Sequence, residues 1–233
     1  MKKAHIHLAA SRIHKWLALI IGIQFLLWFT SGLVMSILPI EKTRGEHLVA
    51  RHRGAVLPAG IDLSKLKVGP VQTIHIVVPN GRALAWTEQA DGRTQLFDVA
   101  SGARQLGISS SEAVAIARAA WLGNPAARTT VAPVSNNSIE YGGRVPAWRV
   151  TFDQPADTRV YVESQTGKIS AVRTANWRIY DFFWSLHIMD WKTHENFNTP
   201  WLIAFAAGAL VMGLAGVLLL VFRWPMRIRR RRV

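Results

Sequence analysis

Two long apolar segments, one near each end, dominate the hydrophobic pattern of this chain. Residues 16–40 contain no charged side chain, and neither do residues 196–222. A helix crosses the hydrocarbon core of a bilayer with about 20 mostly apolar residues, and both segments are longer than that. The pattern therefore predicts two transmembrane helices, with residues 41–195 between them.

The first segment has a second interpretation, a secretory signal peptide. A signal peptide has a shorter apolar region, about 7–15 residues, and ends at a cleavage site of small residues. Residues 16–40 are longer, and no such site closes them. We therefore expect an uncleaved membrane anchor.

The second segment carries local helix signals. Thr199 is a suitable N-cap, and Pro200 suits the first turn of a helix. Small residues then recur at helical spacing and would let another helix approach closely; they are Ala206, Ala209, Gly213 and Gly216. We expect this face to contact the first span or a partner subunit, a second copy of the chain included. Small residues that merely fill a lipid-facing helix are the alternative.

Between the spans, residues 41–175 show short strand patterns separated by turn residues. Alternating or β-branched stretches predict strands over 73–78, 82–89, 93–99, 129–135, 146–152, 159–164 and 168–173. Asp91 and Gly92 form a strong hairpin signal. One helix is predicted over 111–122, with Ser109, Ser110 or Ser111 as its cap.

Part of this region repeats. Residues 81–104 and residues 143–168 both read Gly-Arg, then Ala-Trp in a strand, a turn, a second strand and a glycine turn. Two copies of one hairpin would build a single antiparallel sheet or two small stacked sheets. Trp86 and Trp148 then occupy equivalent positions, and we expect both rings to be buried. The predicted fold class is α+β: two transmembrane helices flanking a domain that has an antiparallel sheet, a packed helix and an internal pseudo-repeat.

The charge distribution predicts an orientation. The chain has a formal net charge of +14, but all acidic residues lie between Glu41 and Glu195. Two basic tails without acidic residues, 1–15 and 223–233, follow from this. Positive residues stay on the cytoplasmic side of a bacterial inner membrane, so we expect both tails in the cytoplasm and residues 41–175 in the periplasm. Residues 176–195 would form an aromatic interfacial helix and loop.

Composition also excludes several classes of protein. The chain has no cysteine, which removes disulfides, iron–sulfur clusters and covalent c-type haem. The basic residues flank apolar segments and match no nucleic-acid-binding motif, so no nucleic-acid partner is expected. No nucleophile elbow, phosphate loop or HExxH motif appears.

Several of these stretches resemble a known family. SSEAVAIARAAW, PAWRVTFDQP and TRVYVESQTGKI are similar to a PepSY domain, and RIHKWLALIIGIQFLLWFTSGL with FFWSLHIMDW resembles the helices of PepSY-associated membrane proteins. The resemblance covers nearly the whole chain. Larger members have four spans or more, whereas two are predicted for this chain.

The resemblance implies two alternative functions. Larger relatives look like inner-membrane reductases that carry b-type haem on histidines and reduce ferric siderophores. By this likeness the chain is an accessory or haem-bearing module of transmembrane electron transfer linked to iron uptake. Soluble PepSY domains look like regulators of peptidases, so the alternative is a tethered, non-catalytic module that binds a peptidase or envelope protein.

Three histidines are candidate haem ligands. His14 opens the first span, where it either snorkels at the interface or serves as a ligand on the cytoplasmic side, as the resemblance implies. His187 lies among aromatic residues before the second span, and His47 follows the first span. On a helix over 177–191, His187 would share one face with Tyr180, Trp184 and Trp191. His5, His7, His52, His75 and His194 are expected to be solvated or to lie on strands.

A haem held by two histidines needs both rings at the same depth. His14 and His187 would lie on opposite sides of a core about 30 Å thick. His47 and His187 are both expected at the outer surface, and a flexible Gly45 would let the chain bring His47 into place. We therefore expect that any haem held within one chain, with its metal, lies between His47 and His187.

Overall fold

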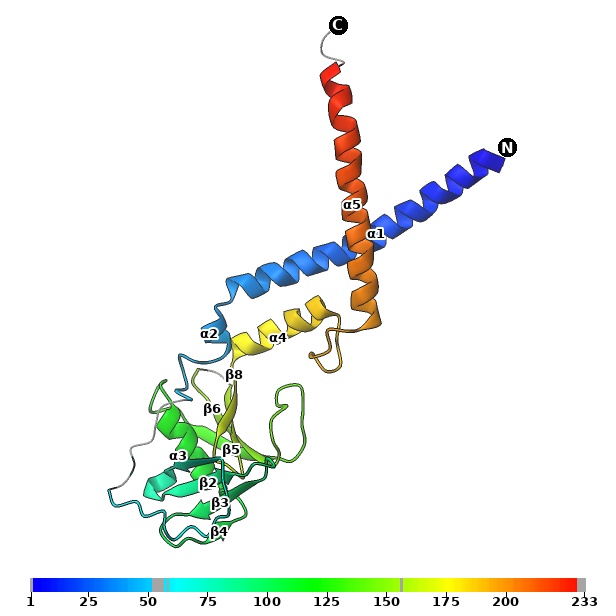
Figure 1. Cartoon of the computed structure of the whole chain (residues 1–233). Coiled ribbons are helices and arrows are strands. Elements are labelled where there is room, and N and C mark those ends of the chain that lie inside the picture. Colours follow the sequence, from blue (N-terminus) through cyan, green and yellow to red (C-terminus); the bar gives the residue numbers. More distant parts are fainter. Residues whose placement is uncertain (1, 52–56, 58, 156, 230–233) are drawn as a thin grey trace. The chain divides into compact units, whose positions relative to one another are not determined.

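The computed structural model describes residues 2–51, 57, 59–155 and 157–229, and the chain divides into two compact units. Residues 38–179 form one unit, which we call the domain. Residues 1–37 and 180–233 form the other, the helical unit. For residues 2–15, 17, 215 and 218–229 only the backbone is described. Figure 1 labels most of the helices and strands of both units.

The helical unit contains α1 (Lys2–Ile37), the second half of α4 (Ala175–Ile188) and α5 (Pro200–Arg229). Within the described residues, one stretch is long and apolar enough to cross a membrane, Ala18–Ile37 in α1. Its length and composition would also suit a signal sequence. The apolar stretch described in α5 is shorter, Pro200–Leu214, so the second span stays a prediction.

Helices α1 and α5 pack against each other. The close approach is at Gly208, where an added Cβ would lie 3.1 Å from the Cδ1 of Ile21. Among the described residues, no atom lies within 4 Å of a Cβ added at Gly213 or Gly216; Ala206 is exposed and Ala209 is half-buried. The contact between the two helices was expected, and the residue that makes it was not.

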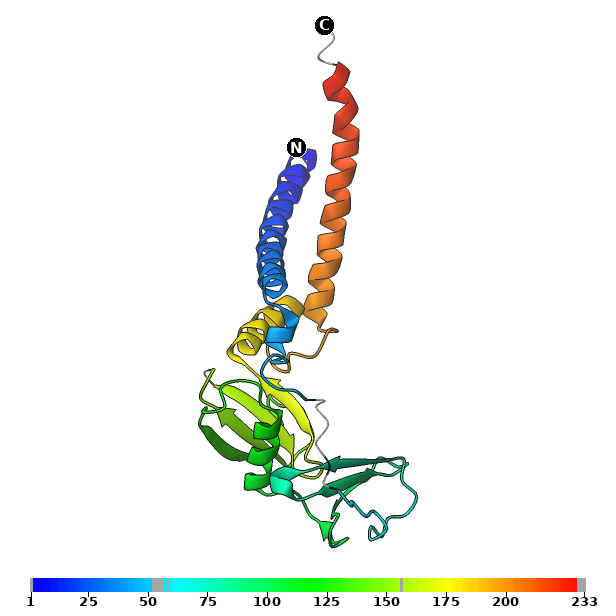
Figure 2. The same cartoon turned by 90° about the vertical axis from the view of Figure 1, so that its left-hand side faces the viewer.

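The domain contains two antiparallel sheets, as Figure 2 shows. The first sheet has the order β1 (Thr73–Val77), β2 (Leu84–Glu88), β3 (Thr94–Asp98), β4 (Arg104–Gln105). The second has the order β5 (Thr129–Val134), β6 (Ala147–Phe152), β7 (Thr158–Glu163), β8 (Ile169–Arg173). Two short helices, α2 (Ile40–Thr43) and η1 (Pro79–Gly81), lie in the same unit. The α+β class is confirmed, and of the two alternatives, one sheet or two small sheets, the domain forms two sheets.

Helix α3 (Ser110–Ala120) lies between the two sheets in sequence and packs on β5, β6 and β7. Ser109 is the cap: its hydroxyl accepts from the amide of Glu112, and the Glu112 carboxylate accepts from the amide of Ser109. This reciprocal pair satisfies two otherwise free helix donors. Both sheets and α3 then bury one shared core, whose largest fully buried members include Phe152, Leu84 and Leu96.

The two hairpins repeat, but with a different alignment from the expected one. The last paired residues are Glu88 and Thr94 in one hairpin and Phe152 and Thr158 in the other, and five residues connect each pair. Counted from these turns, Trp148 corresponds to Leu84, so its predicted equivalence with Trp86 is wrong by one residue pair. The shift is an even number of residues, and side chains alternate along a strand, so both rings still face the shared core. The Trp86 ring is buried as expected, whereas Trp148 is half-buried.

The turn that carries His47 differs from the expected hinge. Gly45 has a φ of +71°, and a Cβ added there would lie 2.6 Å from the Cγ1 of Val172 in β8. Its carbonyl accepts from the amides of Leu48 and Val49, both of which are buried. The expectation of a flexible Gly45 is therefore wrong: glycine is needed because the turn is packed directly against β8.

Candidate functional site

His187 is the candidate ligand with the best-defined surroundings. Its Nδ1 lies 2.9 Å from the hydroxyl of Ser31 in α1, and the indole Nε1 of Trp28 donates to its backbone carbonyl at 2.8 Å. Ser31 is completely buried, and the His187 ring is half-buried. Ser31 lies six residues before the end of α1, about 9 Å along the helix axis. The imidazole of His187 therefore packs against the apolar stretch of α1, inward of its end.

A second polar side chain lies on the same face of α1. Gln24 precedes Ser31 by seven residues, two helical turns. It is only 7 % exposed, and its amide nitrogen has no hydrogen-bond partner among the described residues. Sequence reasoning passed over both residues, although polar side chains inside a membrane-length apolar segment are a recognised signal of function or helix contact.

His14 belongs to the same helix but lies far from this site. Seventeen residues separate it from Ser31, about 25 Å along α1. Since Ser31 contacts His187, His14 and His187 are too far apart to bind one metal ion. This spacing agrees with the expectation that the two histidines lie at different depths.

His47 lies in the domain, in the turn after α2, and its side chain is exposed. His187 belongs to the helical unit, so the pairing of His47 with His187 stays a prediction. His75 is stacked on Trp86, with ring centroids 4.3 Å apart. His52 lies outside the described residues.

The structure corrects two expectations about the segment after His187. Helix α4 ends at Ile188, so Trp191 lies beyond it and shares no helical face with His187. His194 was expected to be solvated, but its side chain is 15 % exposed and its Nδ1 lies 2.6 Å from the Asp181 carboxylate. The pair joins residues 13 positions apart across a turn, a separation that no helical or strand period would have revealed.

The loop after α4 is organised around Asp190. Its carboxylate accepts hydrogen bonds from Thr193, both hydroxyl and amide, and from the amides of Lys192, Glu195 and Asn196. The Thr193 hydroxyl and these backbone donors favour the ionised carboxylate, so the pKa of Asp190 is well below its ordinary value. The loop that connects α4 to α5 is therefore an ordered structure built on one buried carboxylate.

His187 and Asp181, the partner of His194, lie on different faces of α4. Asp181, which holds His194, precedes His187 by six residues, about 9 Å along the axis and about 120° around it. Among the described residues there is also no group of three or more His, Asp or Glu side chains arranged to hold a metal ion. The helical unit therefore offers single imidazoles at separate positions.

The domain has one cluster of charges at the start of α4. Glu140 lies 2.6 Å from Arg159 and 2.8 Å from Arg178, and both arginines also contact Asp157. Burial raises the pKa of Glu140, but hydrogen bonds from Arg178 and Arg159 lower it by more. This cluster joins the loop before β6 to β7 and α4. Because each charged member is paired, we interpret the cluster as a structural network.

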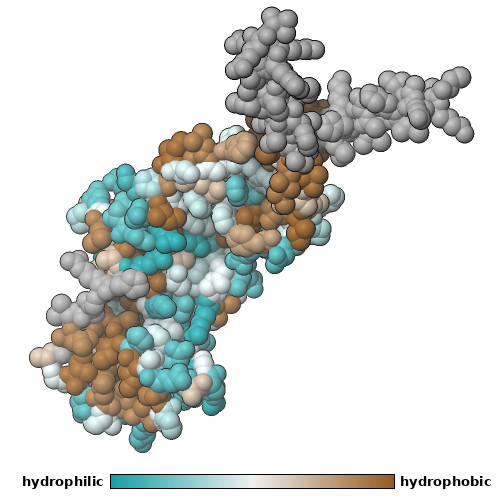
Figure 3. Space-filling model, turned by 45° about the horizontal axis from the view of Figure 1, so that its top comes forward, coloured by the Kyte–Doolittle hydropathy of each residue, from teal (hydrophilic) through white to brown (hydrophobic). Residues whose placement is uncertain are grey.

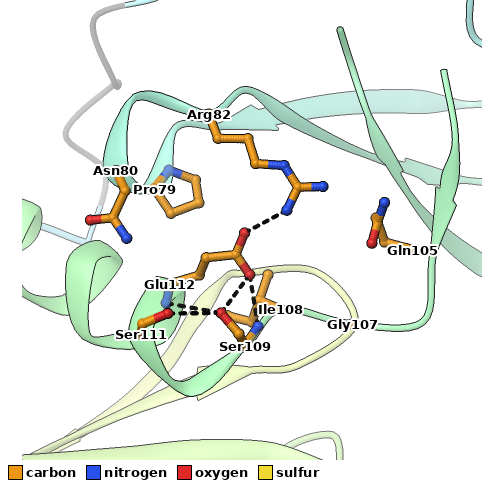
Figure 4. A pocket seen from close by; sticks show the side chains of 9 residues that line it. All are labelled: Pro79, Asn80, Arg82, Gln105, Gly107, Ile108, Ser109, Ser111 and Glu112. Atoms are coloured by element: carbon orange, nitrogen blue, oxygen red, sulfur yellow. Dashed lines mark hydrogen bonds and ion pairs between the residues drawn. The ribbon is translucent and has the colours of Figure 1, made fainter. Parts of the chain in front are cut away.

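A pocket of about 550 Å³ lies at the first turn of α3, as Figure 4 shows. Arg82 bridges Glu112 at 2.9 Å and Asp98 at 2.5 Å on its rim. Gln105 and Gly107 line it, and Leu106 between them is 95 % exposed. Arg82, Ser109 and Glu112 are hydrogen-bonded to one another, and the apolar side chain of Leu106 is exposed beside the pocket.

Comparison with known proteins adds no assignment to this geometry. No protein-family model matches the chain, and no curated protein or solved structure matches it.

Proposed function

We propose that this chain is a membrane-anchored electron-transfer module with a PepSY-like domain, and that it holds b-type haem through His187. The observation that supports this proposal is the imidazole of His187 seated on the apolar helix α1, with Nδ1 hydrogen-bonded to the buried Ser31. Imidazole nitrogen is the commonest axial ligand of b-type haem. Metal-binding histidines usually have their other ring nitrogen hydrogen-bonded in this way.

The surroundings of His187 fit such a group in chemical character. Haem supplies one-electron redox chemistry when bound, and the protein supplies the axial ligand and the low-dielectric environment. In this chain His187 supplies one imidazole, and α1 supplies apolar surface around it. In our prediction, His47 would supply a second imidazole. His14 would belong to a separate site on the cytoplasmic side.

The membrane location is part of the same proposal. Both termini would lie in the cytoplasm and the domain in the periplasm of a bacterial inner membrane, with electrons passing outward to ferric chelates. Large apolar side chains exposed along α1 and α5 support this, because a surface of that kind is stable in lipid and not in water. Figure 3 shows apolar surface on the described part of the helical unit.

A visible spectrum tests the proposal. The full-length chain, purified in detergent from a haem-sufficient bacterial host, should show a Soret band and sharp bands after dithionite reduction. His187→Ala should lose these bands, and His75→Ala should keep them because His75 is stacked on Trp86 in the domain. A colourless wild-type chain, or an unchanged spectrum in His187→Ala, would contradict haem binding at His187.

One observation favours the alternative, a tethered binding module. Leu106 is 95 % exposed beside the pocket at α3, and Leu63 and Ile74 are also exposed in this half of the domain. Figure 3 shows an apolar area on the surface of the domain. A colourless chain that inhibits a peptidase, with inhibition lost in Leu106→Glu, would support this second function.

A further inference from the structure

We infer that Ser31 is a positioning residue for His187: it holds the ring with its proton on Nδ1, so that Nε2 carries the free electron pair. The inference rests on the proposed function only for the identity of the group that Nε2 binds. The orientation of the ring itself follows from the hydrogen bonds of α1.

The direction of the Ser31 hydroxyl proton decides which nitrogen of His187 is protonated. A serine hydroxyl has one proton to donate and two lone pairs to accept with. The Ser31 hydroxyl oxygen lies 3.0 Å from the backbone carbonyl of Trp28 and 2.9 Å from Nδ1 of His187. A carbonyl oxygen only accepts, so the hydroxyl proton is directed to Trp28. The Ser31 oxygen then accepts from His187, which requires a proton on Nδ1.

The other ring nitrogen of His187, Nε2, is then left without a proton. A neutral imidazole, the form that binds metals, carries one proton. With that proton on Nδ1, Nε2 has the lone pair. Nε2 has no hydrogen-bond partner among the described residues, and the ring is half-buried rather than enclosed. The helix α1 therefore selects the tautomer that presents Nε2 as a ligand.

Two further residues of α1, Trp28 and Gly32, lie against His187. Trp28 donates its indole proton to the carbonyl of His187, in the last turn of α4, where carbonyls lack helical partners. A Cβ added at Gly32 would lie 3.8 Å from Cε1 of the same ring, which is van der Waals distance, so the ring lies directly over this turn of α1. Residues from one turn of α1 thus hold both the backbone and the ring of His187.

The hydrogen bond to Ser31 changes the chemistry of Nε2. A hydrogen bond from Nδ1–H raises the basicity of Nε2 and strengthens its bond to the higher oxidation state of a metal. Ser31 is completely buried, so solvent has no ready access to replace its hydroxyl. Without that hydroxyl, the tautomer preference is lost, and the oxidised metal group is less stabilised.

The experiment compares Ser31→Ala with a matched control. Ser36→Ala removes another α1 hydroxyl, one that is exposed and donates only to the carbonyl of Gly32. Ser31→Thr keeps the hydroxyl and serves as the rescue variant. The first measurement is ¹⁵N NMR of the His187 ring in the full-length, haem-free chain in detergent. The second is the midpoint potential of the haem-loaded chain.

We expect the wild type and Ser36→Ala to show the Nδ1–H tautomer, Ser31→Thr to retain it, and Ser31→Ala to show a mixture. The midpoint potential of Ser31→Ala should rise relative to Ser36→Ala. A wild-type ring protonated on Nε2, or identical spectra for Ser31→Ala and Ser36→Ala, would overturn the inference. A wild-type chain that takes up no haem would refute the proposed function alone, because the NMR result tests the ring without haem.

Discussion

The domain and the helical unit place apolar and polar side chains in opposite ways. In the domain the large fully buried residues include Phe152, Leu84 and Leu96, and the charged groups of Glu140 and its arginines are paired near the surface. In the helical unit, Phe29 is 70 % exposed, and apolar residues around it are exposed as well. Its buried residues include polar ones, which are Gln24, Ser31, Ser185 and Asp190.

This difference bears on the solvent that our proposal assigns to each unit. Burial of apolar surface stabilises the domain in water. The same driving force is absent in lipid, where close packing and hydrogen bonds between helices hold a structure together. The helical unit has both features, at Gly208 and at the contact of Ser31 with His187. The contrast between the two units supports our proposal of a bilayer around α1, and the following experiments test that contrast.

The largest effect is expected from enzyme fusions that report on which side of the membrane each part of the chain lies. Alkaline phosphatase is active only outside the cytoplasm, so a fusion after Ser170 should be active in a bacterial host and a fusion after Val233 inactive. The physical reason is the retention of the basic tails on the cytoplasmic side. The reverse pattern of activity would refute the predicted orientation.

Phenylalanine substitutions in the two units should differ strongly. Phe152 is fully buried and stacked on Trp121 with ring centroids 3.8 Å apart, so Phe152→Ala should destabilise the domain by about 3–5 kcal/mol. Phe29→Ala, at an exposed ring, should leave the domain unchanged. Thermal unfolding of the full-length chain in detergent, followed by near-ultraviolet circular dichroism, measures both. Equal shifts for the two variants would contradict the contrast between the units.

Acid should weaken the domain through Asp98. Burial raises the pKa of this carboxyl, but hydrogen bonds from Ser101 and Arg82 lower it by more, so that the pKa is about 2. A carboxyl whose pKa is lower in the folded state binds its proton more readily when unfolded. Its stabilisation is therefore complete above about pH 4 and is lost as the pH falls toward 2, on the order of 2 kcal/mol.

Denaturation midpoints measured between pH 2 and pH 6 test this effect. Asp98→Asn should flatten the profile in that window. Asp91→Asn is the control, because Asp91 pairs with Arg93 at an exposed position and should leave the profile nearly unchanged. If Asp98→Asn keeps the full acid dependence, another carboxyl is responsible.

The smallest effects are expected from two glycines of α5. Gly208→Leu should loosen the α1–α5 contact, because a Cβ there already approaches Ile21 at 3.1 Å. Gly213→Leu should leave this contact intact, since nothing lies within 4 Å of that position. A cysteine crosslink between α1 and α5 would report the contact. Loss of a dimer in Gly213→Leu would support association of two copies through the small-residue stripe.

The strands of the domain were largely predictable because their cause is local. Alternation along 73–78 and 146–152, with turn residues such as Gly92, corresponds to β1, β6 and the β2–β3 turn in the structure. The hairpin repeat was also visible, but its alignment was not. The shared Ala-Trp pair suggested one register, whereas the five-residue turns impose another, shifted by one residue pair.

The candidate site was predictable only in part. A lone histidine among aromatic residues before an apolar segment identified His187 as a candidate. Its partner Ser31 lies 156 residues away, and Asp181 with His194 forms a pair across a turn. Neither contact has a sequence period, because each depends on how two segments pack.

The sequence by itself determined the apolar length of α1, the strands, the presence of a serine cap before α3 and the basic tails. Each depends on neighbouring residues or on composition. Only the tertiary structure decided that Gly208 rather than Gly213 contacts α1, that Gly45 is packed on β8, and that Ser31 receives His187. Those outcomes depend on which faces meet, and the free energy of a contact is set by both partners, of which the local sequence contains only one.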